Sequence, residues 1–252
     1  MTSKLLKTLF ILVLVGVFLV IVVSRTPAAW AAWGIHKVAP NVWFTGVSGT
    51  LWKGQAASAQ VDLGSDSIAL GEMKWKLKPL SLLILSPCMD LSTQLPGQSI
   101  SGKFCRSISG NNKVKDLSVD APMALFSKVS PINGTGAVSL QIASASFDGE
   151  AIKDLNGQAS WQNANVHVEG QWFNLGSFGA ELSDDDQGGA LANITDIAGP
   201  YTLDMNATWA PGKPWQTKGK VTPKPGVPEV VIQALQVFGE DVGGGAYVVQ
   251  FP

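Results

Sequence analysis

The sequence contains few of the residues that build metal and catalytic sites. Its 252 residues include only two histidines, two cysteines and two tyrosines, and 15% of the residues are charged. Neither His36 nor His167 pairs with a cysteine or a second histidine at ligand spacing, so zinc has no obvious ligand set. Neither a Gly-x-Ser-x-Gly elbow nor a Ser-x-x-Lys pair occurs. We therefore predict no catalytic, cofactor-binding or metal-binding residues, and a protein that is not an enzyme.

Basic residues are not in excess. The chain has 18 Lys and Arg against 19 Asp and Glu, and three of the 18, Lys4, Lys7 and Arg25, flank the apolar N-terminus. The rest of the chain therefore carries 15 basic and 19 acidic residues. A nucleic-acid-binding domain needs a basic face, so we predict no nucleic-acid partner.

The one long hydrophobic run lies at the N-terminus. Leu9–Val23 is apolar throughout, and the uncharged span that contains it has 17 residues, which cover about 25 Å as a helix. Lys7 can extend this reach by snorkelling. We predict a transmembrane anchor within residues 1–25, and the positive-inside rule applied to Lys4 and Lys7 keeps the N-terminus cytoplasmic. Everything after Arg25 is then expected outside the cytoplasm.

Residues 26–40 are predicted to form a juxtamembrane segment. Pro27 favours a helix start, and Trp30 and Trp33 are suited to the membrane–water interface. A cleaved signal peptide is the alternative, because Ala29-Trp30-Ala31 could serve as its cleavage site. The length of the apolar run, and Arg25 directly after it, favour the retained anchor.

Residues 41–252 are predicted to be mainly β. The 27 glycines and 14 prolines suggest short strands joined by turns. Apolar and polar residues alternate in Ala57–Leu63 and, most clearly, in Tyr201–Trp209, where one face is apolar. This pattern predicts a strongly curved antiparallel sheet with one packed and one solvated face.

Three segments break the alternation. Pro79–Leu85 suggests a short buried helix or a tight strand, and Pro122–Lys128 suggests a short helix capped by Asp120. Pro228–Phe238 has the apolar stripe of an amphipathic helix and precedes a predicted last strand, Ala246–Phe251. We therefore expect a few short helices, with the last one covering an end of the sheet.

A glycine motif recurs along the chain. Val47–Leu51, Ile100–Phe104 and Leu155–Ala159 share the pattern apolar-x-Gly-x-apolar, with spacings of 53 and 55 residues. One interpretation is a structural repeat of glycine-punctuated strands. The other is that each glycine independently marks a bulge or bend.

Cys88 and Cys105 are the only cysteines. In the oxidising compartment expected outside the cytoplasm they are predicted to form a disulfide, which would close a loop of about 18 residues and stabilise the fold by roughly 3 kcal/mol. Two buried free thiols are the alternative.

Nine tryptophans are the other unusual feature. Most of those in strand-like stretches are expected to fill the core of the curved sheet, with an aromatic-lined groove or partner surface as the alternative; these are Trp43, Trp52, Trp75, Trp161, Trp172 and Trp209. Trp215, beside Pro214, is expected to be exposed in a loop.

The order of several motifs resembles a known family. An N-terminal anchor is followed by Gly49-Thr-Leu-Trp52-Lys-Gly54, then by Trp75-x-Leu77-x-Pro79-Leu80, and later by Leu155-x-Gly157. Together they resemble the type II secretion system protein N family, also called general secretion pathway protein N. The likeness covers nearly the whole chain, and Gly49, Trp52, Gly54, Trp75, Pro79 and Gly157 carry it as structural residues.

The resemblance implies a single-pass protein of the bacterial inner membrane with a periplasmic β domain. Its expected role is that of an accessory or scaffolding subunit in the export of folded proteins, with other inner-membrane and periplasmic secretion components as partners. The glycine-punctuated strands also resemble inner-membrane lipid-transfer proteins built as open β-grooves. Binding of a lipid or hydrophobic ligand is therefore the alternative, which a continuous apolar channel would favour over a filled core.

Overall fold

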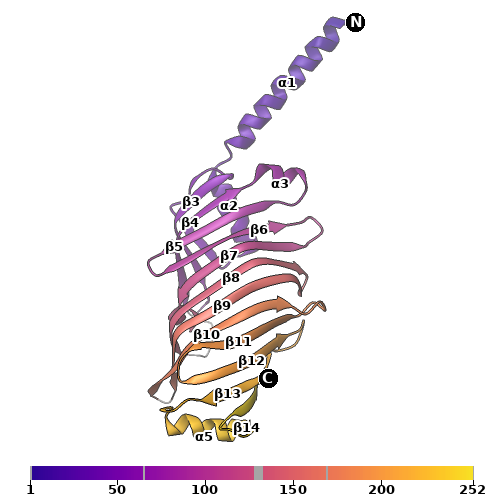
Figure 1. The fold of residues 1–252 in the computed structure, drawn as a ribbon. Coiled ribbons are helices and arrows are strands. Elements are labelled where there is room, and N and C mark those ends of the chain that lie inside the picture. The colour runs from indigo at the N-terminus through magenta and orange to yellow at the C-terminus, as the bar shows by residue number, and fades with distance from the viewer. Residues whose placement is uncertain (1, 65, 128–132, 169, 252) are drawn as a thin grey trace.

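The structure is a computed structural model of the 252-residue chain. It describes residues 2–64, 66–127, 133–168 and 170–251, and within helices and strands it leaves out a few further side chains, such as those of residues 2–7. The described residues form five helices and a single sheet of 15 strands (Figure 1). The helices are α1 (Thr2–Ser24), α2 (Ala28–Val38), α3 (Pro79–Leu83), α4 (Met123–Phe126) and α5 (Glu229–Phe238). The strands are β1 (Val42–Thr45), β2 (Ser48–Gly49), β3 (Lys53–Asp62), β4 (Ser67–Leu77), β5 (Cys88–Leu95), β6 (Gln98–Arg106), β7 (Asn112–Pro122), β8 (Gly134–Asp148), β9 (Ala151–Val168), β10 (Gln171–Asp184), β11 (Ala190–Ala198), β12 (Tyr201–Trp209), β13 (Gln216–Pro223), β14 (Gly239–Asp241) and β15 (Tyr247–Phe251).

The sheet is antiparallel and open. From β3 to β13 each strand pairs with its neighbours in sequence, so the strands follow one another from the α1 end to the α5 end (Figure 1). The order changes only at the two ends, where β1 and β2 both pair with β3 and where β15 lies between β13 and β14. The predicted mainly-β antiparallel sheet with few helices is confirmed.

One face of the sheet is mostly apolar along its whole length. We call it the inner face and define it by the row of directly paired residues that crosses β4 to β15. Side chains of paired residues share a face, and this row consists of Met73, Thr93, Ile100, Val119, Leu140, Ala159, Ala180, Ile194, Met205, Gly219 and Val249.

The opposite, outer face is polar. Its adjacent row runs through the same strands, one residue along each, and consists of Lys74, Ser92, Ser101, Ser118, Gln141, Gln158, Glu181, Asn193, Asn206, Lys218 and Gln250. The sheet is therefore one-sided: water solvates one face, and the other must be covered or occupied to be removed from water.

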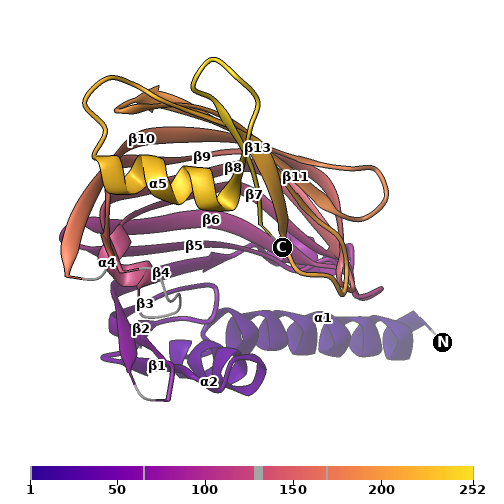
Figure 2. The same cartoon turned by 90° about the horizontal axis from the view of Figure 1, so that it is seen from below.

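Helices cover the inner face at its two ends. Near α1, the side chain of Ala28 in α2 packs with Ala56, Ala59, Met73 and Trp75. At the far end, Val231, Ile232 and Leu235 of α5 pack against a cluster that contains Tyr201, Val221 and Val249 (Figure 2). Each end of the sheet thus has a small core of its own.

Two sequence predictions for strands were wrong in detail. Ala57 was expected to share the buried face with Ala59, but Ala57 is exposed and Ala56 is buried instead. The cause is a register irregularity between Ala56 and Ala59 in the pairing of β3 with β4, because a bulge moves neighbouring side chains to the other face. Trp43 and Trp172, expected in the core, are about half exposed.

The short helices also differ from prediction. The residues from Pro79 form a helix, but it is not buried, because Leu80 is 76% exposed. Asp120 does not cap α4, since it belongs to β7, and Pro122 takes the N-cap position. The predicted last helix is present as α5, and the predicted last strand as β15.

The predicted transmembrane helix is not confirmed. Residues 2–24 form helix α1, which points away from the sheet (Figure 1), yet within the described part of the chain no helix combines the length and the apolar character needed to cross a membrane. The side chains of Lys4 and Lys7 lie outside the described residues. Arg25 follows the end of α1, and Trp30 and Trp33 are exposed on α2.

The two cysteines are bonded in the structure. Cys88 and Cys105 are directly paired residues of β5 and β6 and form a disulfide with an S–S distance of 2.05 Å. The bond joins the two strands at the end opposite their connecting turn, where Leu95 pairs with Gln98. The turn joins the two strands at one end of this hairpin, and the disulfide joins them at the other.

Replacing Cys88 and Cys105 by serine is expected to lower the free energy of unfolding by about 2–4 kcal/mol. Without the cross-link the unfolded chain has more conformational entropy, so unfolding becomes more favourable. Urea denaturation of the two proteins measures the difference. Peptide mapping without reductant should recover the two cysteines in one linked species, whereas two alkylatable thiols in protein from an oxidising compartment would contradict the bond.

Candidate functional site

An apolar groove lies on the inner face between the two end clusters. It has a volume of about 490 Å³ and crosses the five strands β8 to β12, with α4 at one side. Four inter-strand spacings of about 4.8 Å make it roughly 19 Å long. All of its lining residues except Ser160 and Gly179 have apolar side chains. The full lining consists of Met123, Phe126, Val138, Ala159, Ser160, Trp161, Phe178, Gly179, Ala180, Ile194, Leu203 and Met205.

Strand register places these side chains together. Val138, Trp161 and Phe178 are consecutive partners across β8, β9 and β10, so two aromatic rings stand side by side on the inner face. The Trp161 Nε1–H donates to the Thr135 carbonyl oxygen at 3.0 Å, which fixes the ring. A Cβ at Gly134 would lie 3.1 Å from this ring and 3.2 Å from Met123, so the absence of a side chain there allows α4 to pack closely.

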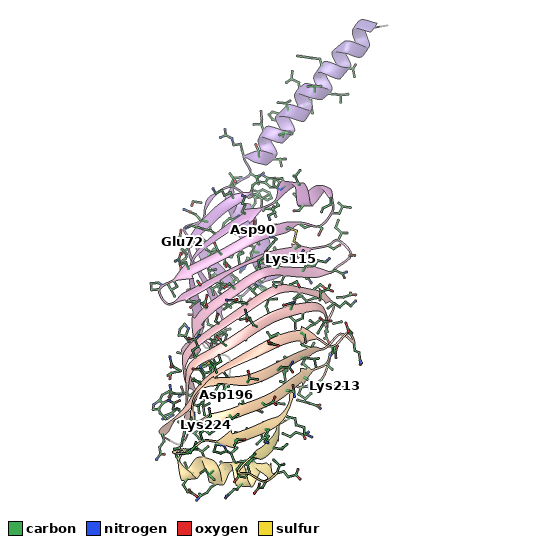
Figure 3. The ribbon with its side chains drawn as sticks, viewed as in Figure 1. Glu72, Asp90, Lys115, Asp196, Lys213 and Lys224 are labelled. Atoms are coloured by element: carbon green, nitrogen blue, oxygen red, sulfur yellow. A yellow bond between two sulfur atoms is a disulfide. The ribbon has the colours of Figure 1, made fainter. Side chains whose placement is uncertain are left out.

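One carboxylate interrupts the apolar rows. Asp196 of β11 is the register partner of Phe178 and so points to the inner face. Its oxygens accept the Leu203 backbone N–H at 2.9 Å and a hydrogen bond from the Lys224 Nζ at 3.2 Å (Figure 3). The Leu203 N–H first, and the Lys224 ammonium after it, hold the pKa of Asp196 below its ordinary value. The carboxyl group therefore stays ionised, and its hydrogen bonds with Leu203 and Lys224 stabilise the negative charge at the margin of the groove.

Replacing Asp196 by asparagine is expected to flatten the loss of stability in acid. A carboxylate whose folded pKa lies below its unfolded value of about 3.9 stabilises the fold fully above that value, and the contribution is lost as the pH falls through the lowered folded pKa. Thermal denaturation between about pH 5 and pH 2 should thus show a shallower slope for Asp196→Asn than for the parent. Asp204→Asn, on the outer face of the next strand, is the control, and equal slopes for all three proteins would contradict this assignment.

Comparison with known proteins identifies the family. Residues 40–250 match the family model described as type II secretion system (T2SS), protein N. The chain belongs to the type II secretion system protein N family.

Two relatives that carry the family name align with most of the chain. The type II secretion system protein N of Aeromonas hydrophila is 25% identical over 221 residues, which are 84% of each chain. That of Vibrio cholerae serotype O1 (strain ATCC 39315 / El Tor Inaba N16961) is 21% identical over 209 residues, 81% of each chain. No solved structure matches. The matched region contains every residue that lines the groove, so the groove belongs to the protein N part of the chain.

Four of the protein N motif residues lie together at the α1 end of the sheet. Trp75 is buried, and its Nε1–H donates to the Leu51 carbonyl oxygen at 3.2 Å. Gly54 lies beneath this ring, which a Cβ there would overlap. Gly49 has a φ of +93° and would bring a Cβ to 2.6 Å from the Lys53 carbonyl oxygen.

Trp52 connects this group to the N-terminal helix. Its Nε1–H donates to the Val23 carbonyl oxygen at 2.8 Å, at the last turn of α1. The backbone N–H of Leu51 donates to the Thr26 carbonyl oxygen at 2.8 Å. The Gly49–Gly54 stretch of the protein N motif therefore attaches the sheet to the end of α1.

The other two motif residues are elsewhere. Pro79 begins α3, and Gly157 lies in β9, where its missing Cβ makes room for the Ile142 side chain. Gly102, in the second glycine motif, likewise faces Leu117. Gly102 and Gly157 thus make room for large inner-face side chains of a neighbouring strand, while Gly49 serves a turn.

The motif residues do not line the groove. Of the residues that do, sequence reasoning singled out Trp161, for which an aromatic-lined groove was the alternative to a core position. The usable signal was the alternation of Val138, Leu140 and Ile142 and that of Leu203 and Met205. Alternation alone predicts a packed face, and only the tertiary structure shows that α2 and α5 cover its ends and leave the groove between them.

Proposed function

We propose that the protein is a non-enzymatic accessory subunit of type II secretion, which supports the export of folded proteins from the periplasm by binding another component on its inner face. The observation that carries this proposal is the mostly apolar row that crosses β4 to β15: α2 and α5 cover its two ends, while the groove beside α4 stays open between them. Apolar side chains bury surface in a complex and do not transfer protons. The proposed activity is therefore contact, with the open sheet edges as further surfaces for pairing.

We also propose that α1 attaches the chain to the inner membrane, with the β domain in the periplasm. The support is the exposure of apolar side chains all around α1, such as Phe10, Leu12 and Val20. Each would be costly in water and favourable in hydrocarbon. Trp30 and Trp33 on the exposed side of α2 suit the headgroup region, and the disulfide suits an oxidising compartment.

Deletion and complementation in a secreting bacterium test the role. Without the protein, secreted substrates are expected to accumulate in the periplasm, and the full chain should restore their export. Crosslinking in intact cells should also recover another component of the secretion apparatus. Unchanged secretion after deletion, together with crosslinks that never contain such a component, would contradict the proposal.

A lipid or other hydrophobic ligand in the groove is the second candidate. The observation that favours it is the lining itself, which crosses five strands and is almost wholly apolar, as in sites that take hydrophobic ligands. Native mass spectrometry of the full chain after detergent exchange should then show a co-purified species of lipid mass. Protein with no retained lipid would remove this candidate and leave the protein-contact proposal standing.

A further inference from the structure

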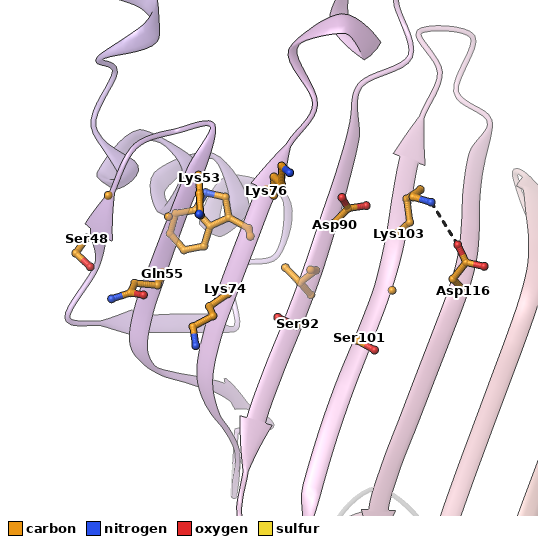
Figure 4. A pocket seen from close by; sticks show the side chains of 15 residues that line it. Ser48, Lys53, Gln55, Lys74, Lys76, Asp90, Ser92, Ser101, Lys103 and Asp116 are labelled. Atoms are coloured by element: carbon orange, nitrogen blue, oxygen red, sulfur yellow. Dashed lines mark hydrogen bonds and ion pairs between the residues drawn. The ribbon is translucent and has the colours of Figure 1, made fainter.

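A second hollow, on the outer face, is rich in lysine. It has a volume of about 940 Å³ and lies over β2 to β7 at the α1 end of the sheet (Figure 4). We call it the basic hollow and define it by its charged residues, Lys53, Lys74, Lys76, Lys103, Asp90 and Asp116. Four ammonium groups thus face two carboxylates on a protein whose net charge is −1.

Strand pairing in the basic hollow sets like charges opposite each other. Lys53 of β3 is the direct partner of Lys76 of β4, and Lys76 has Asp90 of β5 as its partner on the other side. Asp90 forms its ion pair with Lys78, at 3.2 Å, so the two ammonium groups of Lys53 and Lys76 still stand opposite each other. Like charges at directly opposed positions destabilise a sheet. A sheet that keeps this pair would gain stability from an anion placed between the two ammonium groups.

The carboxylates of the basic hollow are already engaged with other lysines. Lys103 pairs with Asp116 at 3.3 Å, and Lys78 pairs with Asp90 at 3.2 Å. Lys74 has its own partner outside the hollow, Glu72, at 3.1 Å. Within the described residues this leaves Lys53 and Lys76 as the two cations of the hollow without an ion pair.

The basic hollow lies where the sheet meets α1. Lys53 directly follows Trp52, whose indole donates to the Val23 carbonyl oxygen at the end of α1. α1 leaves the molecule at this end of the sheet (Figure 1). If α1 enters the membrane, Lys53 and Lys76 lie at the level where phospholipid headgroups begin.

We propose that the basic hollow binds the phosphodiester headgroup of an anionic phospholipid in the membrane that α1 enters. This inference rests on the proposed attachment by α1. Lys53 and Lys76 supply the charge for the phosphate, and nearby polar side chains can donate to the ester and glycerol oxygens; these are Ser48, Gln55, Ser92 and Ser101 (Figure 4). Binding would hold the α1 end of the polar outer face at the bilayer surface and leave the groove on the opposite face free.

Lysine acetylation of the full chain in nanodiscs tests this site. One set of nanodiscs contains only phosphatidylcholine, and the other contains phosphatidylglycerol as a quarter of the lipid. Mass spectrometry is expected to show about fivefold less labelling of Lys53 and Lys76 in the anionic discs. Lys218 and Lys220, on β13 at the far end of the sheet, are internal controls that should label equally in both sets.

Two further arms separate the sources of phosphate and the role of the two lysines. Excess inorganic phosphate added to the phosphatidylcholine discs should give no protection, and protection equal to that in anionic discs would overturn a lipid site. In native mass spectrometry from mixed micelles, Lys53→Gln/Lys76→Gln should lose the preference for phosphatidylglycerol. The Lys218→Gln/Lys220→Gln control should keep that preference.

The possible failures can be told apart. Incorporation into both kinds of disc with equal labelling of Lys53 and Lys76 overturns the headgroup site and leaves the attachment by α1 intact. A chain that does not incorporate into either kind of disc overturns the attachment, and the headgroup site with it.

Discussion

Replacing Trp75 by alanine is expected to lower the free energy of unfolding by about 3–5 kcal/mol. The side chain is only 2% exposed and packs with Ala28 of α2 and with Met73. The change leaves a cavity in the cluster that joins α2 to the sheet and removes the hydrogen bond from the indole to the Leu51 carbonyl. Urea denaturation of the full chain, followed by far-ultraviolet circular dichroism, measures the loss.

Trp172→Ala is the matched control for this experiment. Trp172 is 53% exposed and contacts the His167 ring beside the turn that joins β9 to β10, outside the groove. Its removal is expected to cost less than about 1 kcal/mol. Equal losses for the two variants would mean that the α2 cluster is not the core of this end of the sheet.

Ala180→Glu is expected to reduce secretion by about tenfold, which corresponds to ~1.4 kcal/mol of lost binding. Ala180 lies in the middle of the groove floor, between Ala159 and Ile194. A carboxylate there has no partner within the apolar lining, so any protein surface or acyl chain that enters the groove would bury an unpaired charge. The measurement is the ratio of secreted to periplasmic substrate in cells that express the variant in place of the parent.

Ser183→Glu is the matched control, because it adds the same charge to the same strand on the exposed outer face. Circular dichroism and urea denaturation show whether each variant remains folded. Normal secretion by a folded Ala180→Glu protein would remove the groove from the mechanism. Equal defects in both variants would show that charge on β10, and not the inner face, is responsible.

Local pattern was enough to predict the fold class. The alternation over Tyr201–Trp209 predicts a strand with one packed face, and Tyr201 and Ala207 of β12 are buried. The apolar stripe of Pro228–Phe238 predicts helix α5, although only part of the stripe packs on the sheet, because Val230 and Phe238 are exposed. The glycine motifs predicted structural glycines as well, although Gly157 serves side-chain packing and not a turn.

Features that depend on strand register could not be predicted in the same way. A bulge beside Ala56 changes which alanines of β3 are buried, and the sequence of that stretch contains no signal that predicts the bulge. Lys53 is the strand partner of Lys76, and Trp161 is the strand partner of Phe178. In both cases the register of whole strands places the two residues opposite each other. Both the groove and the basic hollow are consequences of such pairings.

Exposure of tryptophan was also beyond the sequence. Trp43, Trp75 and Trp172 all stand in strands, yet Trp75 alone of the three is buried, in the cluster that contains Ala28 of α2. Trp43 contacts α2 through the His36 ring and stays half exposed. Where α2 and α5 lie on the sheet decides which inner-face residues form a core and which line the groove. Helix placement is a tertiary property, and periodicity does not encode it.

Photo-crosslinking from two adjacent positions of β10 tests most directly whether the inner face is the working surface. A photoreactive residue replaces Ala180, in the groove, or Glu181, on the outer face of the same strand. In secreting cells position 180 is expected to form an adduct with another secretion component, or with a lipid if the second candidate holds, and position 181 is expected to form neither. The same adducts from both positions, or none from position 180, would contradict a function that resides in the inner face.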